Sequence, residues 1–152
     1  MSNVVVRPAH LSDLYDLARL FDAYRQFYEQ PSDVDGATQF LRERLENGDS
    51  VIFIAHAGGV AAGFTQLYPS FTSTGMKRIF VLNDLFVSPA ARKQGVGRML
   101  LDAAAEHGRK EGAARLTLST AVTNLPAQTL YESQGWVRDQ KFFVYNLALL
   151  KR

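Results

Sequence analysis

The chain has 152 residues, 47% of them hydrophobic, with 17 Lys and Arg against 15 Asp and Glu. This length and apolar share fit one globular domain with its own core. A formal net charge of +2 is too small to indicate a protein that binds nucleic acid.

The absence of cysteine excludes disulfide bonds, a thiol nucleophile and thiolate metal sites, and it is consistent with a reducing compartment. No apolar run approaches the roughly 20 residues that a membrane-spanning helix needs, and the N-terminus lacks the features of a signal peptide. We therefore expect a cytoplasmic protein with neither a membrane nor a nucleic acid as partner.

Hydrophobic periodicity and turn residues predict elements in the order β-α-α-β-β-β-α-β-α-β. The first strand is expected at 4–6, followed by a helix capped by Ser12 and a second helix from about 33 to 45. Three strands follow at 50–56, 60–68 and 78–87, with a polar loop at 69–77. The remaining elements are a helix from 96 to 107, a strand at 115–120, a helix at 124–134 and a closing strand at 142–149. This order favours a single mixed α/β domain over residues 1–152.

A glycine-rich hexapeptide, RKQGVG at 92–97, connects the strongest predicted strand to the start of a helix. Backbone N–H groups at such a junction, together with the helix dipole, suit a phosphate or pyrophosphate. A P-loop is excluded because Gly97 precedes Arg98-Met99 rather than Lys-Ser/Thr, and the GxGxxG dinucleotide fingerprint is also absent. The hexapeptide alone leaves a phosphate site and an ordinary solvated turn equally open.

The wider segment, LNDLFVSPAARKQGVGRMLLDAAAEHGRKEG, resembles the signature of the GNAT superfamily of N-acetyltransferases. Arg92, Gly95 and Gly97 meet its coenzyme-loop pattern, Arg/Gln-x-x-Gly-x-Gly/Ala. A second part of the signature appears as RLTLST followed by the frame from Asn124 to Trp136. Within the superfamily the chain is most similar to the spermidine/spermine and yeast polyamine/histone acetyltransferase groups. The resemblance implies the acyl-CoA N-acyltransferase fold, an α/β (α+β) arrangement with a mostly antiparallel sheet flanked by helices.

The resemblance implies acetyl-CoA as co-substrate and no metal. In the family, the loop and helix start bind the pyrophosphate, the preceding strand lends its backbone to the pantetheine amides, and the last helix contacts the coenzyme through an Asn. Lys93 stands where many relatives have glycine, which should alter local charge more than binding. The residues implied for coenzyme binding are Leu85, Phe86, Val87, Arg92, Lys93, Gln94, Gly95, Val96, Gly97, Arg98, Asn124, Ala127 and Tyr131.

Two residues carry the expected catalysis. Tyr131 matches the tyrosine that the family uses to protonate the leaving thiolate, and the alternative is an aromatic side chain packed in the core. Several relatives have a glutamate at the position of Asn83. The asparagine side chain cannot accept a proton. Asp84 matches an aspartate of the polyamine and histone groups, and it is a base, an orienting group or a structural carboxylate. Regular strand alternation would place Asn83 and Asp84 on opposite faces.

The acceptor region is expected near the first helix, where aromatic and acidic side chains suit a cationic amine. The residues expected to line it are Tyr24, Tyr28, Glu29, Asn83 and Tyr145, with Asp33 and Asp35 nearby. A small polyamine-like or amino-acid-like primary amine is the first expectation, and a protein lysine or N-terminus is the second. A regulatory module that binds acetyl-CoA without catalysis is a third reading. A homodimer through the closing strand follows from family habit only.

Overall fold

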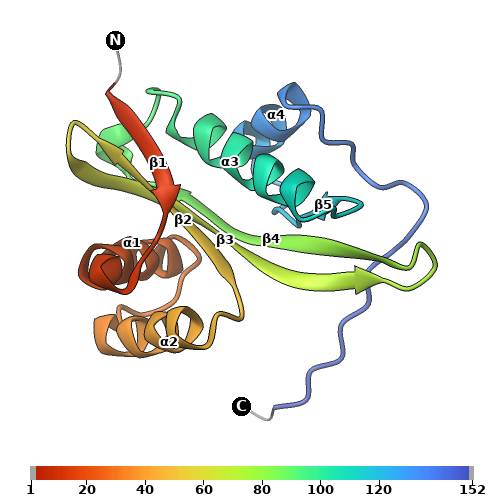
Figure 1. Ribbon diagram of the computed structural model, residues 1–152, viewed down its shortest axis with the longest axis horizontal. Coiled ribbons are helices and arrows are strands. Elements are labelled where there is room, and N and C mark those ends of the chain that lie inside the picture. Colours follow the sequence, from red (N-terminus) through yellow and green to blue (C-terminus); the bar gives the residue numbers. More distant parts are fainter. Residues whose placement is uncertain (1–2, 151–152) are drawn as a thin grey trace. The chain divides into compact units, whose positions relative to one another are not determined.

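The computed structural model describes residues 3–150, which fall into two compact units, one up to Ser119 and one from Thr120 onward (Figure 1). No helix in that part of the chain is long and apolar enough to cross a membrane. The expectation of a single domain over residues 1–152 stays a prediction, and each unit is described by itself.

The first unit contains most of the secondary structure. Its strands are β1 (Val4–Pro8), β2 (Val51–Ala57), β3 (Val60–Thr72), β4 (Lys77–Val87) and β5 (Leu116–Thr117). Its helices are α1 (Leu14–Phe27), α2 (Val34–Asn47) and α3 (Val96–Lys110), with short 3₁₀ turns at Leu11–Asp13 and Pro89–Ala91.

The five strands form one sheet in the order β1-β2-β3-β4-β5. The first three pairings are antiparallel, and only β4 and β5 run parallel. The mixed, mostly antiparallel sheet that the sequence predicts is therefore confirmed. Because β5 is two residues long, its pairing with β4 covers only Phe80 and Val81.

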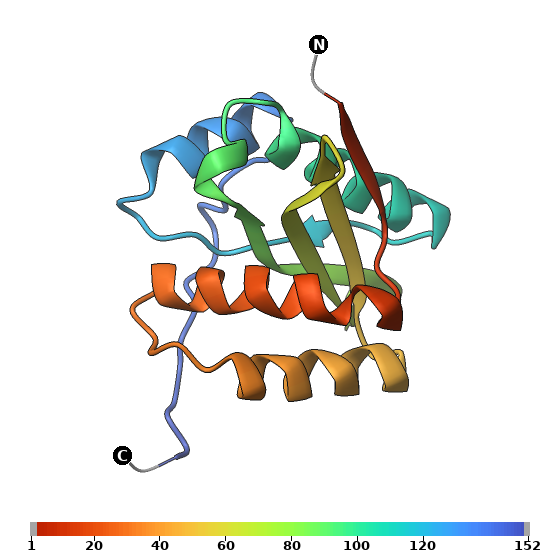
Figure 2. The ribbon, with the colours of Figure 1, turned by 90° about the vertical axis from the view of Figure 1, so that its left-hand side faces the viewer.

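Helices cover both faces of this sheet (Figure 2). Helices α1 and α2 lie side by side on one face, where Leu17, Leu41, Ile54 and Phe64 are fully buried. Helix α3 packs on the other face, where Val96 and Leu100 are buried with residues of β2 and β3. Gly63 of β3 allows this close approach, since a Cβ there would lie 2.6 Å from the Phe86 carbonyl oxygen and 3.2 Å from Val96 Cγ1.

In the first unit most predicted element types are confirmed, and three details are wrong. Ser12 does not cap the first helix, because the chain first makes a 3₁₀ turn in which the Asp13 carboxylate accepts the His10 N–H at 2.7 Å. Strands β3 and β4 extend into the predicted loop at 69–77, since their antiparallel pairing continues to Thr72 and Lys77. The strand predicted at 115–120 shortens to two residues.

The second unit contains helix α4 (Leu125–Ser133), capped by the Asn124 side chain, which accepts the Ala127 N–H at 3.3 Å. The strand predicted at 142–149 is wrong, because this segment forms no strand in the structure. Its apolar side chains are exposed, Phe143 by 90% and Tyr145 by 91%. A strand requires a hydrogen-bonding neighbour, and β propensity alone does not provide one.

Candidate functional site

The loop between β4 and α3 has the backbone of an anion site. Lys93 and Gly95 both have left-handed conformations, with φ of 66° and 80°, and Arg92 Nε donates to the Val87 carbonyl at 3.3 Å. Glycine adopts this conformation freely, whereas Lys93 adopts it at a cost. This backbone requirement gives a physical reason for glycine at position 93 in relatives, beyond the charge change that the sequence suggested.

The first turn of α3 presents amide groups without backbone acceptors. The first hydrogen bond of the helix runs from Met99 N to Gly95 O, so the N–H groups of Val96, Gly97 and Arg98 precede it. Gly95 provides no side-chain cap, and the first turn contains no acidic residue. Apart from its two chain neighbours, no described residue would lie within 4 Å of a Cβ at Gly95. These amides and the helix dipole can bind an oxyanion group such as a pyrophosphate.

Strand β4 offers a backbone edge beside this loop. The parallel pairing with β5 ends at Val81 and Thr117, so in the described residues no strand pairs with that edge of β4 from Leu82 to Val87. Leu85 and Val87 direct their side chains to the α3 side of the sheet, and Phe86 packs with the α1 and α2 side. The main chain of these residues can therefore hydrogen-bond an extended amide-containing ligand, as β-strand addition does.

A β-bulge interrupts β4 next to this edge. Gln66 of β3 opposes Asp84 and Leu67 opposes Leu82, which leaves Asn83 without a partner in the register. The extra residue breaks the regular alternation of side chains, and Asn83 Nδ2 donates to Asp84 Oδ1 at 3.1 Å. The expectation that these two side chains face opposite sides is therefore wrong, because the bulge brings them into contact.

Asp84 is buried beside polar side chains. Its side chain is 5% exposed, and burial raises the pKa of the carboxyl group, against hydrogen bonds from Gln66, Tyr24 and Asn83 that lower it. Burial disfavours the charged carboxylate, and donors to that carboxylate favour it. A raised pKa suits a group that must accept a proton near neutral pH.

Helix α1 brings two of the predicted acceptor residues to the bulge. The Tyr24 hydroxyl donates to the Asn83 carbonyl at 3.3 Å, and its ring packs against Tyr28 with centroids 5.2 Å apart. Tyr28 is 45% exposed. Glu29, immediately after the helix, is also exposed and has φ of 64°. The structure therefore groups Tyr24, Tyr28, Asn83 and Asp84, with Glu29 at the edge of the group.

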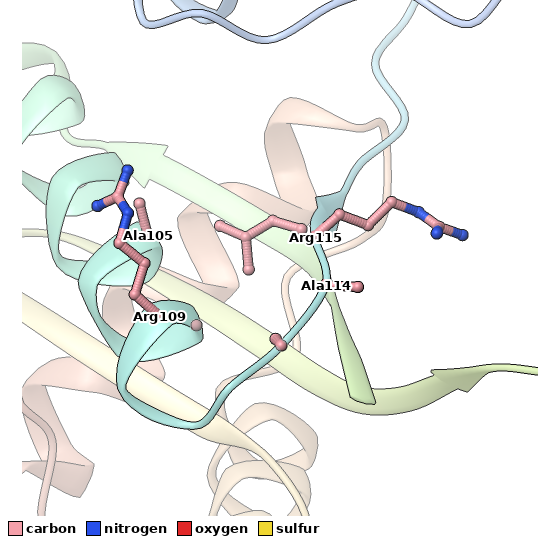
Figure 3. Close-up of a pocket in the computed structure, with 7 residues that line it drawn as sticks. Ala105, Arg109, Ala114 and Arg115 are labelled. Carbon is pink, nitrogen blue, oxygen red and sulfur yellow. The ribbon is translucent and has the colours of Figure 1, made fainter. Parts of the chain in front are cut away.

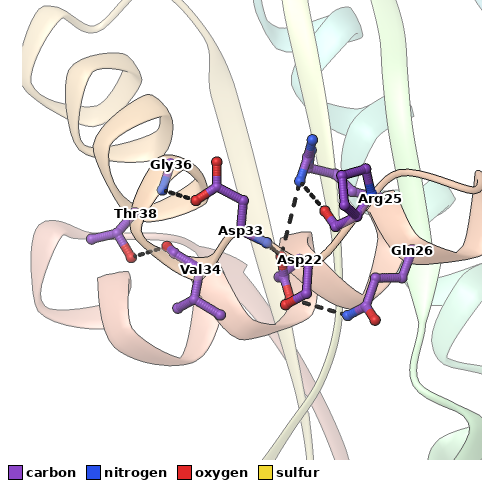
Figure 4. Close-up of polar contacts among 9 residues, drawn as sticks. Asp22, Arg25, Gln26, Asp33, Val34, Gly36 and Thr38 are labelled. Carbon is purple, nitrogen blue, oxygen red and sulfur yellow. Dashed lines mark hydrogen bonds and ion pairs between the residues drawn. The ribbon is translucent and has the colours of Figure 1, made fainter.

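Asp22 on α1 is a buried carboxylate that the sequence analysis missed (Figure 4). It accepts hydrogen bonds from Ser32 Oγ and Asp33 N, both at 2.7 Å, and from Gln26 Nε2 at 3.0 Å. Asp33 itself caps α2 by accepting the Gly36 N–H, which gives its carboxylate a structural role. A signal was present in the sequence, since Asp22 follows Ala18 by four residues on the apolar face of the helix.

Three predicted residues lie in the second unit. Asn124 is the N-cap of α4, as expected, and Tyr131 lies two turns later with its ring 5.9 Å from that of Trp136. Tyr145 belongs to the exposed segment after α4. Ala127 supplies the N–H that Asn124 accepts. The expected contacts of these residues with a coenzyme or acceptor stay predictions.

A separate pocket of about 220 Å³ lies at the opposite end of α3 (Figure 3). Arg109 and Arg115 line it, with Leu116 and four small residues, and the two guanidinium groups point away from one another in Figure 3. His107 on the same helix packs edge-on against Phe53 and Phe80. In the described residues no group of three or more His, Cys, Asp or Glu could hold a metal ion.

Comparison with known proteins decides the family. The sequence pattern of the Acetyltransferase (GNAT) family matches residues 15–136. The chain belongs to this family. A protein of Bacillus subtilis named as an uncharacterized N-acetyltransferase, YhfO, is 51% identical over 142 residues, which cover 93% of this chain and 95% of that protein. These matches identify this GNAT chain as an enzyme of the acetyltransferase class.

Two further relatives extend the comparison. The crystal structure of a probable acetyltransferase has a TM-score of 0.92 and 41% identity, covering 97% of this chain and 99% of the other. The thialysine N-epsilon-acetyltransferase of Caenorhabditis elegans is 29% identical over 134 residues, which cover 88% of this chain and 81% of that protein. The GNAT fold expected from the sequence is therefore confirmed.

Proposed function

We propose that this GNAT enzyme moves the acetyl group of acetyl-CoA to a primary amine by direct attack in a ternary complex. The observation that carries the proposal is the pair of features at one end of the sheet. Among residues 3–150, the first turn of α3 presents amides without backbone acceptors, and the neighbouring edge of β4 has no strand partner beyond Val81. A coenzyme with a pyrophosphate and an amide-containing arm needs both.

The same features assign the donor-binding residues. The loop from Arg92 to Arg98 binds the pyrophosphate through its backbone and its positive side chains. Leu85, Phe86 and Val87 hold the pantetheine arm through their main chain, and Asn124, Ala127 and Tyr131 of α4 complete the set by family resemblance. Acetyl-CoA supplies an activated thioester, and none of these assignments needs a metal.

The reaction forms a C–N bond and breaks the C–S bond of the thioester. A backbone N–H of Phe86 or Val87 polarises the thioester oxygen, and the amine nitrogen attacks the carbonyl carbon. Asp84, buried and with a raised pKa, accepts the proton that the amine loses, directly or through water. Tyr131 donates a proton to the departing thiolate. No covalent acetyl-cysteine can form, because the chain has no cysteine.

The acceptor is a small amine that resembles a polyamine or an amino acid. Tyr24 and Tyr28 provide aromatic faces beside Asn83, and Glu29 adds a negative charge at the rim. Such a group attracts a cationic amine by charge and cation–π contact. The name of the worm relative, a thialysine N-epsilon-acetyltransferase, agrees with an amino-acid-like acceptor. Tyr145 is the fifth residue proposed to contact it.

Two alternatives differ from this proposal, one in its acceptor and the other in whether any thiol is released. A protein lysine or N-terminal acetyltransferase would act on peptides, and an acetyl-CoA-binding regulatory module would release no thiol. Asn83 at a position where several relatives have a glutamate favours the regulatory module. The proton acceptor Asp84, which the bulge brings beside Asn83, favours the enzyme.

Thiol release from acetyl-CoA, followed over a panel of polyamines, amino acids and lysine-containing peptides, tests the proposal. Acceleration by small amines supports it, and acceleration by peptides alone would replace the acceptor class. Tight coenzyme binding without amine-dependent release would overturn the catalytic proposal. The Tyr131→Phe variant should then lower turnover with little change in coenzyme affinity, and unchanged turnover would remove the acid role of Tyr131.

The remaining proposals concern the cellular location and the oligomeric state of the enzyme. We propose a cytoplasmic location, which agrees with the lack of cysteine. A homodimer is proposed because six large apolar side chains between 142 and 150 are each at least 78% exposed, in addition to Tyr145. Apolar surface of this kind marks contact sites. The six apolar side chains are those of Phe142, Phe143, Val144, Leu147, Leu149 and Leu150.

A further inference from the structure

A chain of buried polar side chains runs from the start of β2 to the β4 bulge. Ser50 Oγ donates to Gln66 Oε1 at 2.9 Å, and Gln66 Nε2 donates to Asp84 Oδ2 at 2.8 Å. Gln66 has no exposed surface, and Asp84 is 5% exposed. A fully buried amide is unfavourable unless both of its ends are hydrogen-bonded, and here each end has a defined partner.

The Asp84 carboxylate determines which end of the amide it meets, and the Ser50 hydroxyl donates to the other end. With Oε1 accepting from Ser50, the amide presents its N–H to the carboxylate. The reverse orientation would place Oε1 against Asp84 Oδ2, two acceptors in contact, unless the carboxyl group were protonated. The other oxygen, Oδ1, accepts a hydrogen bond from Asn83 Nδ2 at 3.1 Å.

We propose that Gln66, anchored by Ser50, is a positioning residue that fixes the Asp84 carboxylate through Oδ2 and leaves Oδ1 to Asn83 of the proposed acceptor site. Gln66 acts through Asp84 and does not touch the reacting atoms. The inference rests on the proposed function only in taking Asp84 as the proton acceptor. The hydrogen-bonded chain itself is independent of that role.

The side chains around Asp84 determine how its carboxyl group titrates. The groups that face it are Tyr24 from α1, Gln66 and Tyr68 from β3, and Asn83 from its own strand. Burial raises the pKa of Tyr68 to about 12, and Arg44 and Asp49 add smaller opposing effects on that hydroxyl. Tyr68 therefore stays neutral over the range in which Asp84 titrates. Removal of the Gln66 donor should raise the pKa of Asp84 further, because a bond to the charged form is lost.

The test is a ¹³C NMR titration of the labelled Asp84 carboxyl carbon, assigned with Asp84→Asn. Gln66→Met keeps the side-chain length and should raise the midpoint by about one pH unit, the size expected for one donor to a buried charge. Gln39→Met, at an exposed glutamine on α2, is the matched control and should leave the midpoint unchanged. An unchanged midpoint in Gln66→Met would overturn the inference.

A second pair of variants tests the role of Ser50. Ser50→Ala leaves Gln66 Oε1 without its donor, so the amide is held less firmly and the same midpoint should rise by a smaller amount, and Ser50→Thr should restore it. If Ser50→Ala has the wild-type midpoint, Ser50 does not anchor Gln66. The two Ser50 variants also test the inference if Gln66→Met fails to fold.

The pH profile of amine-dependent thiol release separates this inference from the proposed function. The acid limb of the profile should move in Gln66→Met by the shift that NMR measures, and it should vanish in Asp84→Asn. A shifted NMR midpoint with an unmoved rate profile would support the positioning of Asp84 and contradict its catalytic role. A lost limb in Asp84→Asn with no NMR shift in Gln66→Met would leave the proposed function intact and overturn the inference.

Discussion

Three aspartates buried in the first unit differ in what surrounds their carboxylates. Asp13 pairs with Arg7 at 2.7 Å, and Asp22 accepts bonds from Ser32, Gln26 and a backbone N–H. Both environments lower the carboxyl pKa. Asp84 has donors but is more strongly affected by burial, which raises its pKa. The first two carboxylates therefore favour their charged form in the fold, and only the third has a raised pKa, as the proposed proton acceptor requires.

The pair of Asp13 and Arg7 predicts a defined loss of stability in acid. Hydrogen bonds from Arg7 hold the pKa of Asp13 at about 2, below its ordinary value of 3.8. A lowered pKa stabilises the fold above pH 3.8, and this contribution is lost as the pH falls toward 2. Asp13→Asn should reduce the free energy of unfolding at pH 7 by about 1–2 kcal/mol.

Chemical denaturation between pH 2 and pH 7 measures this contribution. The difference between wild type and Asp13→Asn should shrink as the pH falls through the range from 3.8 to about 2. A difference that stays constant over that range would show that the charge of Asp13 contributes nothing to stability.

At the scale of single residues, the sequence predicts which residues belong to the candidate site better than it predicts what those residues contact. Asp84 and the glycines of the loop can be selected from the sequence because their types fit a motif. The contact between Asn83 and Asp84 cannot, since it depends on a bulge that appears only when β4 is paired with β3. The left-handed backbone of Lys93 is equally hidden, because a lysine gives no signal for positive φ.

Helix α3 joins the packing of the sheet to the proposed donor site. Val96, its first residue, is 1% exposed and belongs to the core between α3 and the sheet. Gly97 and Arg98 follow it in the first turn, where N–H groups have no backbone acceptor. The packing of Val96 thus fixes the position of the amides that we propose to bind the pyrophosphate.

Gly97→Ala tests that element without backbone strain. Gly97 lies in the helix and is not among the residues with positive φ, so alanine should leave the melting temperature unchanged or slightly higher. The added methyl group crowds the first-turn amides, and the Kd for acetyl-CoA should rise about tenfold, which corresponds to roughly 1.4 kcal/mol. Calorimetric titration measures the change.

The control for this variant is Gly75→Ala, which changes an exposed glycine in the turn between β3 and β4. It should bind acetyl-CoA as the wild type does. Equal affinity of Gly97→Ala and wild type would place the pyrophosphate elsewhere.

The elements differ in how far the sequence determines them. Helix α2 begins and ends as predicted because local signals define it, the Asp33 cap and the left-handed Gly48. The strand predicted at 142–149 fails because its pattern states only that the segment is apolar and extended. Whether such a segment becomes a strand depends on a hydrogen-bonding neighbour, which the local sequence does not identify.

At the scale of the whole molecule, the exposed apolar segment gives the dimer proposal a direct test. Phe143→Lys combined with Leu147→Lys should reduce the measured mass from twice the chain mass to the chain mass, because two charges disfavour burial of the segment. Light scattering after size-exclusion chromatography measures this. Met76→Lys, at an exposed position in the turn between β3 and β4, is the control and should leave the mass unchanged. A wild-type protein that is monomeric at all concentrations would contradict the dimer.

The central claim is that acetyl-CoA binds where the β4 edge meets the start of α3. Amide hydrogen exchange with and without acetyl-CoA tests it over the whole chain in one measurement. We expect slower exchange in peptides covering Arg92 to Met99 and Leu85 to Val87, with no change in α2. Saturated binding with protection confined to other segments, or no binding at all, would contradict the claim.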